Sequence, residues 1–138
     1  MDFSKLDTAT PANAGEALQI INPFTGEPLE GTIILLRGAD SAEFQRATKA
    51  AGNRRLESMT KKGAQNTVTI EALAKDTVEA FVAVTIGWSG IELDGKELDY
   101  SEANARKLYS DERFPWLVEQ LDTFVGNRRN FMKASLKT

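Results

Sequence analysis

The stretch TIEALAKDTVEAFVAVTIG, residues 69–87, decides the fold. Apolar side chains recur in it every three or four residues, and charged side chains occupy the positions between them. This spacing predicts the core helix of the protein, capped within residues 67–69 and ending at Gly87, with Trp88 as its last core residue. The expected apolar stripe comprises Ile70, Leu73, Ala74, Val78, Phe81, Val82, Thr85 and Trp88.

Two β-like segments and a weaker helix precede this helix. Branched residues are frequent at 18–21 and 32–36, and the turn-rich stretch 22–28 separates them, which predicts a β-hairpin with a long loop. The segment 32–36 is apolar at consecutive positions, so we expect it to be covered on both faces or paired with another chain. Asp40 or Ser41 then caps a helix that runs to about Met59, packs its thin apolar stripe on the hairpin and shows its basic side to water or a partner.

Shorter signals follow the core helix. Residues 91–98 alternate around Asp94-Gly95, which predicts a short second hairpin. Ser101 caps a helix that ends at Leu108 and Tyr109, and Pro115 begins a final helix. That final helix is expected to carry Leu117, Leu121, Phe124, Val125, Phe131 and Met132.

These elements predict an α+β fold, mostly helical, with an N-terminal β-hairpin and a short second hairpin. We expect residues 1–16 to be a flexible arm, residues 17–138 to form a single domain and residues 61–66 to be a linker. With 138 residues, 41% of them hydrophobic, the chain can bury a core without a disulfide or metal. The opening residues lack a signal-peptide pattern and no segment approaches 18 uninterrupted apolar residues, so we expect a cytoplasmic protein with no membrane partner.

The composition restricts the chemistry. The chain has no cysteine and no histidine, which excludes thiol nucleophiles, imidazole bases and Cys/His zinc sites within it. The motif GWSG at 87–90 is one residue short of a nucleophile elbow and has no histidine to activate Ser89. The acidic residues Asp94, Glu97, Asp99 and Glu102 lack the order of a calcium loop, and no phosphate-binding glycine motif occurs. We therefore expect no catalytic residue, no metal and no cofactor.

Charge is distributed in blocks. The net charge of -3 argues against nucleic acid as a partner. Residues 46–62 nevertheless contain six bases and one acid, residues 92–122 contain nine acids and four bases, and the last sixteen residues contain four bases and no acid. Such blocks are typical of solvated helix faces and also suit contacts between protein surfaces.

Aromatic residues near the C-terminus provide the candidate binding site. Large aromatics at helical spacing are more often core than contact surface, but the two rings that flank Pro115 cannot easily face one core. We therefore predict that one of them is an exposed anchor. The predicted protein-binding residues are Phe114, Trp116, Arg128, Arg129 and Phe131. If Trp116 packs inward instead, the binding face moves to the basic side of residues 46–62.

Several motifs in the C-terminal half carry a family resemblance: GWSG at 87–90, DGKE at 94–97, YSEANA at 100–105, FPWL at 114–117, and the stretch from Phe124 to Phe131. They resemble the tail assembly chaperones of long-tailed bacteriophages. The first hairpin and residues 40–44 resemble that family more loosely, and residues 1–16 and 53–68 do not. The resemblance implies a non-enzymatic protein that binds the tape measure protein, keeps it soluble and releases it as tail tube protein polymerises. It assigns no individual binding residues.

Two other classes stay open. A structural virion protein, such as a tail completion or tube-associated component, could use the strand at 33–36 for intersubunit sheet pairing, and self-association is open for either class. An enzyme ranks third, because the usual catalytic side chains and motifs are missing.

Overall fold

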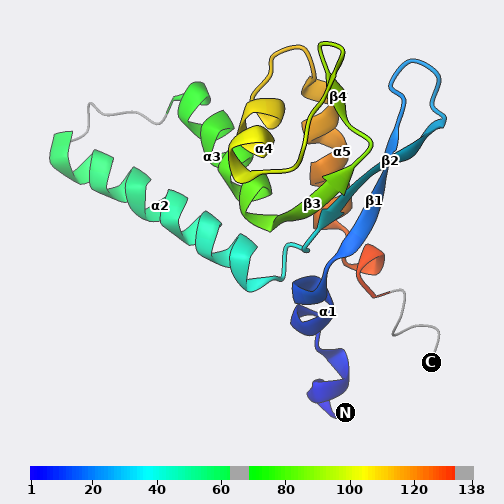
Figure 1. Ribbon diagram of the computed structural model, residues 1–138. Helices are drawn as coiled ribbons and strands as arrows, with labels where there is room; N and C mark the ends of the chain where they lie inside the picture. The colour runs from blue at the N-terminus through cyan, green and yellow to red at the C-terminus, as the bar shows by residue number, and fades with distance from the viewer. Residues whose placement is uncertain (63–68, 133–138) are drawn as a thin grey trace.

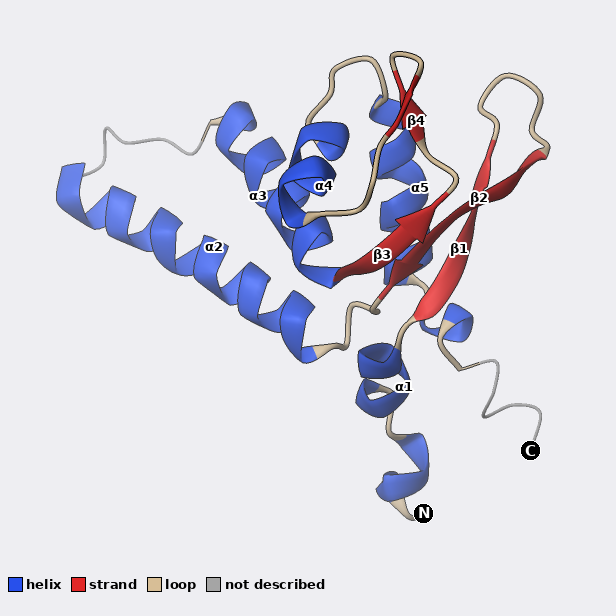
Figure 2. Ribbon diagram, in the orientation of Figure 1, coloured by secondary structure: helices blue, strands red, loops and turns tan. Residues whose placement is uncertain are grey.

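The computed structural model describes residues 1–62 and 69–132 and has an α+β fold, as predicted. Helices make up 54% of it, and both of its sheets are antiparallel (Figures 1 and 2). The helical elements are η1 (Phe3–Leu6), α1 (Ala9–Ala14), α2 (Ala42–Lys62), α3 (Ile70–Val84), α4 (Glu102–Tyr109), α5 (Pro115–Gly126) and η3 (Arg128–Asn130). The strands are β1 (Glu16–Ile21), β2 (Pro28–Leu36), β3 (Thr85–Ser89), β4 (Glu92–Leu93) and β5 (Lys96–Glu97).

Strand β2 is the centre of a three-stranded sheet in the order β1-β2-β3. The predicted hairpin of β1 and β2 is confirmed, with Leu18 opposite Ile34. Ile34 and Leu36 point into the core and are fully buried, whereas Leu35 on the other face is 42% exposed. Of the two alternatives predicted for this strand, coverage on both faces is therefore wrong for the part of the chain that is described, whereas pairing with another chain stays a prediction. Its two edges are paired with β1 and β3, but the core lies on one side only.

The predicted core helix ends early. Helix α3 stops at Val84, and Thr85–Ser89 pair with β2 instead of forming the last helical turn. The Thr85 hydroxyl donates to the Phe81 carbonyl at 2.7 Å, and its backbone leaves the helix in an extended conformation. The β-branched residues Thr85 and Ile86 favour a strand, and pairing with β2 provides hydrogen bonds that a helix end would leave unsatisfied.

Only the C-terminal half of α3 belongs to the core. Ala80, Phe81, Val82 and Val84 are buried, whereas Ile70 is 82% exposed. The predicted apolar stripe is thus wrong for the first turns of the helix. The core lies between the sheet and helices α3, α4 and α5, with α5 behind the sheet in Figure 1.

The local signals after α3 are confirmed, except at the end of the last helix. Asp94 and Gly95 form the turn between β4 and β5 with φ values of 52° and 80°. Ser101 caps α4 by accepting from the Asn104 N–H at 3.0 Å, and Pro115 is the first residue of α5. Helix α5 ends at Gly126 rather than continuing to residue 132, because the Asn127 side chain accepts from the Arg129 N–H and starts the separate turn η3.

Helix α2 leaves the sheet and packs on α3 (Figure 1). Ser41 caps it, as predicted, by accepting from the Phe44 N–H at 3.2 Å. Phe44 packs against the core, and Ala51 is buried farther along the helix. The expectation that this helix packs on the hairpin is wrong, because its main neighbour is α3, to which Arg54 and Arg55 are joined by ion pairs with Asp76. Of the expected linker at 61–66, residues 63–66 lie outside the described residues.

Residues 1–16, expected to be a flexible arm, contain two short helices and the first residue of β1. Ala12 is buried, and its carbonyl accepts from the Gly38 N–H at 3.0 Å. The Asn13 side chain accepts from the Ala42 N–H at 2.9 Å. Helix α1 therefore packs against the connection between β2 and α2.

Candidate functional site

The two rings that flank Pro115 both pack against the core. Phe114 and Trp116 are half-buried and meet edge to face, with 6.3 Å between their centroids. The Arg113 guanidinium lies 5.0 Å from the centroid of the Phe114 ring. Neither ring stands free of the core as the sequence predicted for one of them.

The other predicted binding residues lie at the opposite end of α5, about 18 Å away along a helix of twelve residues. Arg128 donates two hydrogen bonds to Asp40, at 2.6 and 3.1 Å, and holds the pKa of that carboxyl below its usual value. Phe131 is 6% exposed and packs on Phe124. Arg129 is exposed. The structure thus brings Arg128 and Phe131 to the β2–α2 connection and does not join them with Phe114 and Trp116 into one surface.

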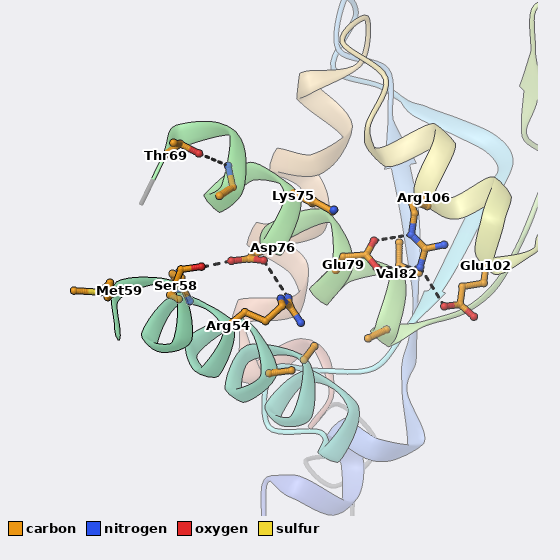
Figure 3. Close-up of a pocket in the computed structure, with 15 residues that line it drawn as sticks. Arg54, Ser58, Met59, Thr69, Lys75, Asp76, Glu79, Val82, Glu102 and Arg106 are labelled. Carbon is orange, nitrogen blue, oxygen red and sulfur yellow. Dashed lines mark hydrogen bonds and ion pairs between the residues drawn. The ribbon is translucent and has the colours of Figure 1, made fainter. Parts of the chain in front are cut away.

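A cleft of about 750 Å³ lies between α2 and α3 and reaches α4 (Figure 3). Helix α2 contributes one wall, and α3 with α4 contributes the other. Its small and apolar lining residues are Ala47, Ala50, Met59, Ala72, Val82 and Ala83. Its polar lining residues are Arg54, Arg55, Ser58, Thr69, Lys75, Asp76, Glu79, Glu102 and Arg106.

The sequence of each helix places these residues on one face. Ala47, Ala50 and Arg54 are spaced by three and four residues along α2. The same spacing joins Ala72, Asp76, Glu79 and Ala83 along α3. The two faces therefore line the cleft with short apolar side chains and with charged groups.

Asp76 joins the two walls. It accepts from Arg54 at 3.1 Å and lies 3.9 Å from a guanidinium nitrogen of Arg55. Two cations of α2 therefore share one carboxylate of α3.

The reverse arrangement occurs where α3 meets α4. Arg106 donates two hydrogen bonds to Glu79, at 2.7 and 3.0 Å, and a third to Glu102 at 3.2 Å. These bonds lower the pKa of Glu79 and raise that of Arg106. Two carboxylates share one cation, so the charge imbalance is opposite to that at Asp76.

The three acids that line the cleft, Asp76, Glu79 and Glu102, all pair with arginine. The lowered pKa of Glu79 makes this carboxylate a weak general base. In residues 1–62 and 69–132 no group of three or more acidic side chains could hold a metal ion. Asp94, from the acidic group noted in the sequence, pairs with Arg113 at 2.8 Å.

The sequence indicated one wall of this cleft and missed the other. The basic block at 46–62 was the alternative binding face, and Arg54 and Arg55 belong to it. Nothing local indicated that Asp76 and Glu79 face this helix and α4, since the contacts join residues 21 to 27 positions apart.

The chain matches no protein-family model, no curated protein and no solved structure. Among the described helices, none combines the length and apolar character that crossing a membrane requires.

Proposed function

We propose that this protein is a non-catalytic assembly chaperone of a long-tailed bacteriophage, which binds the tape measure protein in the host cytoplasm and keeps it soluble. The observation that carries the proposal is the open cleft between α2 and α3. Tail tube protein is the second proposed partner, since it replaces the chaperone when the tube polymerises.

The motifs that resemble the chaperone family occupy positions that determine the fold. Gly90 has a φ of 74°, and a Cβ there would overlap the carbonyl of Gly31. The Trp88 indole N–H donates to the Leu98 carbonyl at 2.8 Å, and Ser101 caps α4. A resemblance at such positions supports a shared fold, because these contacts join β3, the second hairpin and α4.

The cleft has the properties that a chaperone of a helical client needs. Grooves between helices commonly bind a further amphipathic helix. A surface rich in ion pairs and poor in large apolar groups binds reversibly and in a salt-dependent manner, which permits release of the client.

Co-expression with the tape measure protein of the same phage tests this proposal. We expect the tape measure protein to move from the insoluble to the soluble fraction and to co-purify with this chain. Mass spectrometry of purified virions should not detect this chain. An insoluble client, with no co-purification, would refute the chaperone function.

A structural virion component is the second candidate, and the outer face of the sheet favours it. Leu35 is 42% exposed and Ile86 is 38% exposed on β2 and β3. Strand β2 has both edges paired, so contact between subunits would use this face rather than sheet extension through β2. Detection of the chain in purified virions would favour this candidate.

A further inference from the structure

We infer that the α2–α3 cleft binds one amphipathic helix whose long edges carry opposite charges, the acidic edge against α2 and the basic edge against α3 and α4. This inference rests on the proposed function, in which the helix belongs to the tape measure protein. It adds the chemistry of the segment that occupies the cleft and the orientation of that segment between the two walls.

The shape of the cleft suits a helix of about three turns. From Ala47 to Met59 the α2 wall is about 18 Å long, because a helix rises about 1.5 Å at each of the twelve steps between these residues. Ala47 and Ala50 on one wall and Ala72 on the other let a third helix approach closely, since small side chains shorten the distance between helix axes. The occupant therefore needs a stripe of modest apolar side chains along its centre.

The charges of the two walls determine which charge each edge of the bound helix carries. The α2 wall contributes Arg54 and Arg55 and no acid. The opposite wall contributes the acids Asp76, Glu79 and Glu102 and the bases Lys75 and Arg106. Arg54 and Glu102 have side chains 59% and 73% exposed, so both remain accessible to a partner. A helix with one acidic and one basic edge satisfies both walls.

The same charges argue against a polyanion in the cleft. A phosphate backbone requires positive charge along its whole path, and the three carboxylates of the α3–α4 wall would repel it. The net charge of -3 adds to this repulsion.

A pair of designed helical peptides tests the inference without the tape measure protein. Both have the same composition and the same apolar stripe, but the first has separate acidic and basic edges and the second has its charges mixed. By NMR titration of the full chain, we expect the first peptide to bind at least ten times more tightly and to shift the amide signals of Ala47, Ala50 and Ala72. Equal affinity, or shifts confined to α5, would overturn the inference.

A steric variant provides a matched control. Ala72 and Ala74 are both exposed on α3, but only Ala72 lines the cleft. Ala72→Trp should weaken the first peptide at least tenfold, whereas Ala74→Trp should change its affinity less than twofold. Equal effects of the two variants would overturn the inference. If Ala72→Trp lowers the melting temperature, the titration of the unaltered chain decides.

Charge exchange tests the assignment of the edges. Glu102→Lys should weaken binding of the first peptide and strengthen binding of a peptide in which the basic edge is made acidic. If Glu102→Lys leaves the preference between the two peptides unchanged, the assigned orientation is refuted. If the tape measure protein co-purifies equally with wild type and Ala72→Trp, the cleft inference fails and the chaperone function stands. If the first peptide binds the cleft but the tape measure protein does not co-purify, the cleft inference stands and the chaperone function fails.

Discussion

Two halves of the molecule differ in the interactions that stabilise them. One half is built from the sheet, α4 and α5, and the other from α2 and the first turns of α3. In the first half, large side chains such as Ile34, Leu36 and Leu121 are fully buried. In the second half, Arg54 and Arg55 bridge to Asp76, and Ile70 is 82% exposed. Burying a large apolar side chain contributes about 1.5–3 kcal/mol, whereas an exposed ion pair contributes at most about 1 kcal/mol. The α2–α3 half is therefore the part that can adjust to a partner at little cost.

The largest expected effect is on stability, and it compares the buried end of α3 with its exposed first turns. Phe81→Ala should lower the free energy of unfolding by about 3–5 kcal/mol, because Phe81 is 3% exposed. Leu73→Ala, at a position 43% exposed, should lower it by less than about 1 kcal/mol. Chemical denaturation of both variants measures the difference. A loss below about 1 kcal/mol for Phe81→Ala would contradict the core described above.

The next effect concerns the turn after β3. Gly90→Ala should lower the free energy of unfolding by more than about 2 kcal/mol, because it combines a positive φ with overlap of the Gly31 carbonyl. Gly87→Ala is the control, since a Cβ there meets no atom within 4 Å. Equal stability of the two variants in thermal melts would show that β2 and this turn do not approach as closely as described.

A smaller effect distinguishes the cleft from the aromatic site that the sequence predicted. Trp116→Ala should cost about 1–2 kcal/mol of stability, since the ring is half-buried against the core. Co-purification of the tape measure protein should fall only as far as the fraction of folded Trp116→Ala protein falls. If the melting temperature stays unchanged while binding weakens by more than about 2 kcal/mol, Trp116 is an anchor and the binding surface moves to α5.

The smallest effect is on the response to acid. Hydrogen bonds from Arg113 lower the pKa of Asp111 to about 2, and Arg106 lowers the pKa of Glu79 in the cleft. A carboxyl with a lowered pKa in the folded state stabilises the protein above about pH 4, and this contribution is lost as pH falls toward 2. The melting temperatures of Asp111→Asn and wild type should therefore differ at pH 6 and converge near pH 2.

The ion pair between Glu79 and Arg106 in the cleft allows the same measurement of melting temperature against pH. Glu79→Gln should show the same convergence with acid, and 0.5 M salt should reduce both differences, because ion pairs at the surface are screened. Parallel melting curves across this pH range would mean that these pairs contribute nothing to folding.

The sequence by itself determined the elements whose signals act within a few residues. Ser101 caps α4, Asp94-Gly95 turns the second hairpin and Pro115 starts α5, because each acts on backbone groups close to it in the chain. Together with the predicted N-terminal hairpin and core helix, these signals were sufficient for the fold class but not for the ends of α3 and α5.

Tertiary structure decided the rest. Thr85–Ser89 continue the apolar pattern of a helix but form a strand, because β2 supplies partners from about fifty residues earlier in the chain. Phe131 is buried because Gly38, 93 residues away, leaves room for its ring. The cleft depends on Arg54 reaching Asp76 and Arg106 reaching Glu79. Periodicity reports which face of an element is apolar, but the neighbour that this face meets depends on how the whole chain packs.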